Sequence, residues 1–209
     1  MNHFSQKFLK YLLLSSIFIT SFNQVNAANI LINDNEVKST SVDLSDNDSV
    51  DFIGTSGALI QGELQVDSDR ILANIGATNS GGVGNINFII ANTTLTINGD
   101  IGSSSNNINQ IALDTDRTLN SLGNIYLQNG IITNTDNSGI LTLSGNAAQT
   151  ITANIGATNR LNTIDLSGAG TKTFSGSDLK TTNFTTLAGS GLTTINNSGA
   201  VDLGTTSLN

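Results

Sequence analysis

The sequence predicts an all-β protein, a parallel β-solenoid or β-helix-like repeat domain that follows a cleaved N-terminal segment. Three observations lead to this fold class. Asn, Thr, Ser and Gly contribute 29, 26, 23 and 21 of the 209 residues and Ile another 23, whereas Pro and Cys are absent. β-Branched residues favour strands, and Gly and Asn favour turns. Short stretches alternate apolar and polar residues, and one phrase recurs at long range.

The chain opens on a segment typical of a secretory signal peptide. Two lysines precede an apolar run at residues 11–20, and Val25 and Ala27 occupy the small-residue positions that a signal peptidase reads. The run is too short for a transmembrane anchor, because spanning a bilayer takes about 20 apolar residues. We therefore predict a signal peptide at residues 1–27, cut before Ala28, and a mature chain without a transmembrane helix.

An internal repeat organises the mature sequence. The phrases LANIGATN at 72–79 and TANIGATN at 152–159 share seven consecutive residues, and a weaker copy contains Ile101. The anchors Ile75, Ile101 and Ile155 are 26 and 54 residues apart, which indicates a unit of roughly 26–27 residues, within the range of solenoids. This spacing predicts that Ile75 and Ile155 occupy equivalent inward positions in related coils.

The repeat also suggests the domain organisation. Residues 71–209 are expected to form the Gly/Asn/Thr-rich repeat region. Residues 28–70 are more acidic and match the repeat poorly, so they are expected to form an N-terminal cap or the first strands. A β-sandwich is the alternative fold, because Asn98-Gly99 and Asn129-Gly130 are hairpin signals. The long period, and side chains suited to ladders between stacked coils, favour the solenoid.

The mature sequence lacks most side chains that carry catalysis. The one histidine, His3, lies in the predicted signal peptide, and Cys and Trp are absent. Ser-His-Asp and Cys-His catalysis and His/Cys metal sites are therefore excluded. We expect no enzyme activity and no catalytic, cofactor-binding or metal-binding residues. Nucleic-acid binding is not expected either, since it needs a basic patch and the basic residues of the mature chain are scattered: Lys38, Arg70, Arg117, Arg160, Lys172 and Lys180.

Carboxylates leave one enzymatic alternative open, a polysaccharide-processing β-solenoid. Some glycosidases need only a pair of carboxylates. Asp114 and Asp116 are the closest such pair in the repeat region, and strand alternation would place both on one face. The competing interpretation is a solvated face that limits aggregation.

A second acidic cluster, formed by Asp43, Asp46, Asp48 and Asp51, resembles the start of a calcium loop. The loop pattern then fails, because position six is Asp51 rather than Gly and position twelve is Gly57 rather than Glu. Calcium binding stays open beside the simpler interpretation of a solvated acidic turn. Residues 81–86 resemble a calcium-binding nonapeptide repeat only once, so we interpret them as a glycine-rich turn.

The phrases ANIGATN, LTLSGN and IDLSGAGTKTFSG, behind a signal peptide, resemble the passenger region of rickettsial surface-antigen autotransporters, the group of outer membrane proteins A and B. The resemblance covers most of residues 70–209 and implies a cell-surface passenger carried by a C-terminal β-barrel. The sequence ends at Asn209 within repeat-like sequence, without the strands of about ten residues that a barrel needs. We therefore expect an N-terminal fragment whose barrel is missing or separately encoded.

The expected function is that of an exported passenger fragment with a structural or adhesive role. Its expected partners are a host-cell surface or the extracellular matrix. The expected location follows from export through the inner membrane. It is the cell surface or outer membrane if the chain is joined to a barrel, and otherwise the periplasm.

Overall fold

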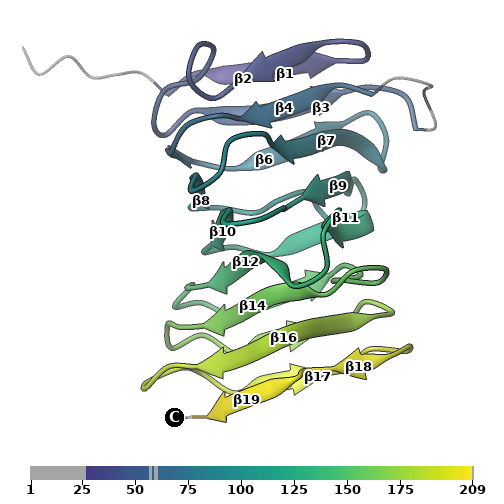
Figure 1. Cartoon of the computed structure of the whole chain (residues 1–209). Coiled ribbons are helices and arrows are strands. Elements are labelled where there is room, and N and C mark those ends of the chain that lie inside the picture. The colour runs from purple at the N-terminus through teal and green to yellow at the C-terminus, as the bar shows by residue number, and fades with distance from the viewer. Residues whose placement is uncertain (1–26, 57, 59–60, 209) are drawn as a thin grey trace, which may run out of the picture.

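The protein is a parallel β-solenoid of about eight turns, as the sequence predicts. The computed structural model describes residues 27–56, 58 and 61–208. Figure 1 shows the coils stacked from the N-terminal coil at the top to the C-terminal coil at the bottom. Every strand pairing is parallel, which excludes the β-sandwich alternative. Except for Ala27, the predicted signal peptide lies outside the described residues.

Each full coil passes over three faces, which we number in chain order. Face 1 carries β1 (Asn29–Asn33), β3 (Ser49–Ile53), β6 (Ile75–Thr78), β13 (Gln149–Thr152), β15 (Lys172–Phe174) and β17 (Thr193–Ile195). Face 2 carries β2 (Val37–Ser39), β4 (Glu63–Val66), β7 (Val83–Phe88), β9 (Ile108–Ala112) and β18 (Val201–Asp202). Face 3 carries β5 (Arg70–Leu72), β8 (Thr94–Ile97), β10 (Thr118–Ser121), β12 (Ser138–Leu143), β14 (Leu161–Leu166) and β19 (Thr205–Leu208).

Two long strands cross a corner and so belong to two faces. The strand β11 (Ile125–Ile132) pairs with β13 at its start and with β9 at its end, and its register shifts between Leu127 and Gly130. The strand β16 (Leu179–Thr186) pairs with β18 at its start and with β14 and β19 further on. The Asn129-Gly130 pair therefore lies at a bulge inside β11 and not in a hairpin.

The core consists of apolar columns that run along the solenoid axis. On face 1, successive coils align Val50, Ile75, Ile101, Ile125, Ile151 and Phe174. On face 2 they align Leu64, Ile86, Ile111, Ile131, Ile155 and Leu179. All these side chains are at most 1 % exposed. Burial of each contributes about 1.5–3 kcal/mol to the stability of the fold.

The two copies of ANIGATN do not occupy equivalent positions. Ile75 belongs to the face 1 column, where it pairs with Val50 and Ile101. Ile155 belongs to the face 2 column, where it pairs with Ile131 and Leu179. The predicted equivalence is therefore wrong, although both side chains point inward. The prediction of a uniform unit of 26–27 residues is also wrong, because paired residues of successive coils are 26 residues apart at Ile75–Ile101 but 24 apart at Ile131–Ile155.

Part of the abundance of asparagine is explained by the corners. Among the residues that the structure describes, six other than glycine have a positive φ, and five of them are asparagine. Asn tolerates this left-handed conformation better than most residues because its short polar side chain can hydrogen-bond locally. These positions are Asn35, Asn47, Asn79, Asn92, Asn137 and Asp116.

Residues 81–86, which the sequence predicts to form a glycine-rich turn, form a turn only in their first part. Residues 79–82 do turn, but the chain is already extended from Val83 onward in β7. Gly84 has a φ of 78°, and a Cβ at this position would lie 2.1 Å from the ring of Phe52. The glycine is therefore needed so that the phenylalanine of the preceding coil can enter the core.

Residues 28–70 form β1 to β4 and the beginning of β5, and they stack directly on the next coils of the solenoid. The first coil has no face 3 strand, and residues 40–48 form turns there instead. Among the described residues, no helix is long and apolar enough to cross a membrane.

Candidate functional site

The outward side of face 3 presents a regular and mostly polar surface, and we call it the threonine face. Strand alternation points apolar side chains inward and polar ones outward. Six strands, β8, β10, β12, β14, β16 and β19, contribute in register. Its first column consists of Thr94, Thr118, Ile140, Thr163, Asn183 and Thr205. Its second column consists of Thr96, Asn120, Thr142, Asp165, Thr185 and Ser207.

The core behind the threonine face holds it in place. Between the two outward columns, Leu95, Leu119, Leu141 and Ile164 point inward and are 0 % exposed. Neighbouring strands in a sheet lie about 4.8 Å apart. The face therefore presents hydroxyl and amide groups, interrupted by Ile140 and by the carboxylate of Asp165, at a spacing fixed by the backbone. The hydroxyls of Thr96 and Thr142 form no hydrogen bond to other residues that the structure describes, so they are available to a partner.

A hollow of about 300 Å³ adjoins the N-terminal end of the threonine face. Asp46, Asp69, Arg70, Ile71, Thr94 and Thr96 line it. Arg70 donates from Nε to the carbonyl of Thr40 at 2.8 Å and lies 3.9 Å from Asp46. Asp69 accepts a hydrogen bond from the backbone N–H of Thr94 at 2.7 Å. The hollow thus places groups of both charges beside the hydroxyls of Thr94 and Thr96.

A second polar array lies on face 2. Asn109 donates from Nδ2 to Oδ1 of Asn85 at 2.8 Å, and Asn129 donates in the same way to Asn109 at 2.7 Å. This asparagine ladder joins three successive coils. It confirms the expectation that stacked coils align like side chains, and it shows that part of the polar surface serves cohesion between coils.

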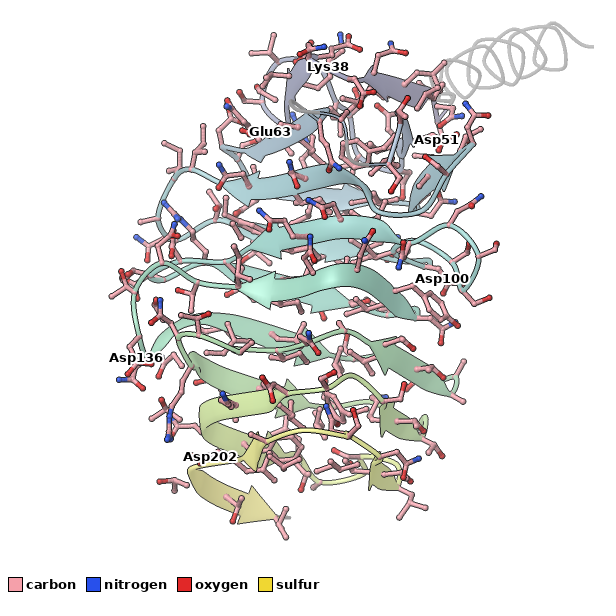
Figure 2. All side chains as sticks on the ribbon, turned by 90° about the vertical axis from the view of Figure 1, so that its right-hand side faces the viewer. Lys38, Asp51, Glu63, Asp100, Asp136 and Asp202 are labelled. Carbon is pink, nitrogen blue, oxygen red and sulfur yellow. The ribbon has the colours of Figure 1, made fainter. Side chains whose placement is uncertain are left out.

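Most carboxylates of the repeat region are used to hold corners. Asp100, Asp136 and Asp178 accept backbone hydrogen bonds from Asn124, Arg160 and Ala200 at 2.7, 2.8 and 2.9 Å. Each donor belongs to the next coil. Figure 2 shows Asp51 and Asp100 along one edge of the solenoid and Asp136 and Asp202 along the opposite edge. The acidic residues therefore contribute mainly to the stacking of coils.

Asp114 and Asp116, the carboxylate pair that the sequence singles out, do not lie on one strand face. Residues 113–117 connect β9 to β10, and Asp116 sits in this turn with a φ of 54°. The Asp114 carboxylate accepts hydrogen bonds from the backbone of Asn134 at 2.6 Å and from Thr133 at 3.0 Å. Arg117 lies 3.3 Å away.

These contacts stabilise the charged form of the Asp114 carboxylate. Burial raises its pKa, but the hydrogen bonds from Asn134 and Thr133 and the charge of Arg117 outweigh burial and hold the pKa of Asp114 below its usual range. A glycosidase acid needs the opposite shift. The geometry therefore favours a structural role for Asp114.

The four carboxylates of the N-terminal acidic cluster accept hydrogen bonds from different residues and do not converge on one site. Asp43 accepts from the backbone of Ser39, Asp46 from Ile71, and Asp48 from Ala28 and Ser45, whereas Asp51 accepts from the hydroxyl of Thr78. Within the described ranges, no group of three or more His, Cys, Asp or Glu residues is placed to hold a metal ion.

Two internal polar residues were missed at the sequence level. Gln149 and Lys172 are neighbours in register on face 1, and both point into the solenoid. Gln149 donates to the carbonyls of Ser121 and Gly123, and Lys172 donates to those of Gly145 and Gly170 at 2.7 and 2.9 Å. Burial lowers the pKa of Lys172. Alternation contains the signal, because Lys172 stands two residues before the buried Phe174.

Comparison with known proteins gives no match. No protein-family model, no curated protein and no solved structure is significantly similar to the chain.

Proposed function

We propose that the protein is an exported surface passenger, of the kind that the rickettsial surface antigens exemplify, and that the threonine face is its adhesive surface. The observation that carries the proposal is the continuity of that face, which extends over six strands in register. A surface of this kind binds through many weak contacts spread along the solenoid. The partner is an extended one on a host cell or in the extracellular matrix.

The use of carboxylates elsewhere in the chain supports this role. Asp100, Asp136 and Asp178 hold corners, and Asp114 is fixed by Asn134 and Arg117. The hydroxyls of the threonine face, by contrast, keep free hydrogen-bonding capacity at Thr96 and Thr142 within the described structure. The polar groups that the two columns offer to a partner are therefore uncharged, except for the carboxylate of Asp165.

A cell-binding assay tests the adhesive part. The exported chain, labelled and incubated with host cells or matrix, is compared with the double variant Thr96→Tyr/Thr142→Tyr. Tyrosine is uncharged and suits strands, so it changes the shape of the face and leaves its charge unchanged. We expect the double variant to bind about tenfold more weakly. The matched control is Thr152→Tyr, an exposed substitution on face 1, which should bind as the unchanged chain does.

Two results would contradict the adhesive role. One is binding no stronger than that of a control protein of matched composition. The other is equal loss of binding in the double variant and in Thr152→Tyr.

The export part has its own test. Replacement of Leu13 and Leu14 by Asp interrupts the apolar run of the predicted signal peptide. The precursor should then remain uncleaved in the cytoplasm, as followed by its mass. Normal processing of this variant would mean that the N-terminus is not a signal peptide.

A further inference from the structure

Asp48 is a buried carboxylate without a cationic side chain beside it. It is 4 % exposed and forms no ion pair within the described part of the chain. Its Oδ1 accepts a hydrogen bond from the backbone nitrogen of Ala28 at 2.7 Å, and its Oδ2 accepts one from Ser45 at 2.8 Å. A buried charge is costly unless it is paired and hydrogen-bonded. The carboxylate therefore lacks the countercharge that its burial calls for.

The backbone holds Asp48 and Ala28 in fixed positions. The carbonyl of Asp48 accepts from the N–H of Ala73, and its own N–H donates to Ser45. The carbonyl of Ala28 accepts from the N–H of Ser49 at 2.8 Å, and β1 begins at Asn29. The nitrogen of Ala28 is thus directed at the Asp48 carboxylate by contacts that do not depend on the residues before it.

The bond between Ala27 and Ala28 lies at the surface. Both residues are exposed, and both line a hollow of about 490 Å³ on the outside of face 1, together with Asp51 and Gly76. This is also the bond at which the sequence predicts signal-peptidase cleavage. Hydrolysis adds water across it, leaving a carboxylate on Ala27 and an amine on Ala28 that takes up a proton at neutral pH.

We infer that Asp48 is the receptor for the mature N-terminus, so that removal of the signal peptide converts the Ala28–Asp48 hydrogen bond into a buried ion pair. The inference rests on the export prediction within the proposed function. The ammonium occupies the place of the amide nitrogen and needs no rearrangement of the backbone. It supplies the missing positive charge, and a charge-assisted hydrogen bond is stronger than a neutral one. Processing therefore locks the first coil onto the second.

The contact also discriminates between cleavage sites. A cut before Ala28 delivers the ammonium to Asp48, whereas a cut after Ala28 removes the donor and leaves the carboxylate with Ser45 alone. The inference requires a start at Ala28, and the mass of the exported chain checks this. A chain that starts at Asn29 or at any other residue would overturn the inference.

A double-mutant cycle tests the ion pair itself. One chain starts at Ala28 and a second retains Ala27, and each is prepared with Asp48 and with Asp48→Asn. Asparagine keeps an acceptor oxygen for the Ala28 nitrogen but removes the charge. With Asp48, the chain that starts at Ala28 should melt about 2–4 °C higher than the one that retains Ala27. With Asp48→Asn the difference should vanish, whereas the nearby control Asp43→Asn should preserve it.

Labelling of the α-amino group provides a readout that packing alone does not move. Pairing with a carboxylate favours the protonated amine, and one unit of pKa shift reduces the reactive fraction about tenfold. At pH 7 an amine-selective acylating reagent should therefore label the Ala28 terminus about tenfold more slowly with Asp48 than with Asp48→Asn. Equal labelling rates, or equal melting temperatures of the two Asp48 chains, would overturn the inference. The second comparison holds even where Asp48→Asn fails to fold, and neither readout depends on cell adhesion.

Discussion

The two copies of ANIGATN have the same sequence and different structures. In the first copy, Ile75 begins the strand β6 on face 1, and Gly76 continues it without a positive φ. In the second copy, Ile155 forms only isolated bridges on face 2, to Ile131 and to Leu179, and Gly156 turns away with a φ of 63°. In both copies the residues Ala-Asn before the isoleucine turn a corner, from face 3 to face 1 in the first and from face 1 to face 2 in the second.

The difference shows that this phrase encodes a corner and not a whole coil. The isoleucine that follows the corner points into the core in both copies. Ile75 joins the apolar column of face 1, and Ile155 joins that of face 2. The backbone conformation after the isoleucine depends on the neighbouring coil. Residues 75–78 pair along their length with residues 50–53 of the preceding coil and stay extended, whereas Ile155 forms only isolated bridges and the chain turns at Gly156.

The largest expected effect is one that the two copies share. Ile75 and Ile155 are each 1 % exposed and lie between apolar side chains of the coils on either side. Ile75→Ala and Ile155→Ala should each cost about 2–5 kcal/mol in urea unfolding, because each leaves a cavity in a packed column. The exposed Thr78→Ala and Thr158→Ala should cost far less. A negligible cost at either isoleucine would mean that its column is misplaced.

The glycines after the two isoleucines should separate the copies. A Cβ on Gly156 would lie 2.4 Å from the carbonyl oxygen of Lys180, and the backbone there is left-handed. Gly156→Ala should therefore cost about 1–3 kcal/mol. A Cβ on Gly76 would lie 3.5 Å from Asp51, an ordinary contact. Gly76→Ala should change the unfolding free energy by less than about 1 kcal/mol. Equal costs would show that both copies share one backbone.

The asparagines before the isoleucines should separate the copies more weakly. Asn154 accepts from the backbone N–H of Ser177 at 2.7 Å and holds the next coil. The side chain of Asn74 is exposed and makes no hydrogen bond to the described residues. Asn154→Ala should thus cost about 0.5–1.5 kcal/mol and Asn74→Ala little, as thermal unfolding would show. A greater loss at Asn74 would reverse the comparison.

Lowering the pH should weaken the corner that the Asp67 carboxylate holds, but not the corner that the Asn154 amide holds. Burial raises the pKa of Asp67, but hydrogen bonds from Ser39, Thr40 and Ser41 outweigh it and lower the pKa to about 2. This contribution to stability is present above the ordinary pKa near 4 and is lost as the pH falls through the folded value near 2. Between these values, the unchanged chain and Asn154→Ala should lose more stability than Asp67→Asn. Parallel losses in all three proteins would exclude this role of Asp67.

Local patterns predicted the strands well and the register poorly. The alternation in Thr94-Leu95-Thr96-Ile97 correctly predicts which side chains enter the core, since Leu95 and Ile97 are 0 % exposed. Coil length could not be predicted, because the separation between paired residues of successive coils varies from 20 residues at Ile30 and Val50 to 26 at Ile75 and Ile101. With a constant period of about 27 residues, the position predicted two coils after Ile101 is Ile155, which already lies beyond the corner between face 1 and face 2.

The same limit applies to the candidate site. The outward hydroxyls of face 3 follow from alternation in single strands. The hollow beside them does not, because Asp46, Asp69 and Thr94 come together only through the register of successive coils. The position of Asp114 differs from the prediction for a related reason. Strand alternation ends with β9 at Ala112, and Asp114 lies in the turn that follows.

Disulfide trapping tests most directly whether the second copy starts from face 1 and not, like the first copy, from face 3. Thr152, the first residue of that copy, pairs with Tyr126 across adjacent coils, and the chain has no cysteine of its own. Paired strands bring Cα atoms within disulfide range, whereas a shift of two residues exceeds it. On oxidation, Tyr126→Cys/Thr152→Cys should therefore form an intramolecular disulfide and Tyr126→Cys/Thr150→Cys should stay reduced. Failure of the first pair to close, or equal closure of both pairs, would contradict the account.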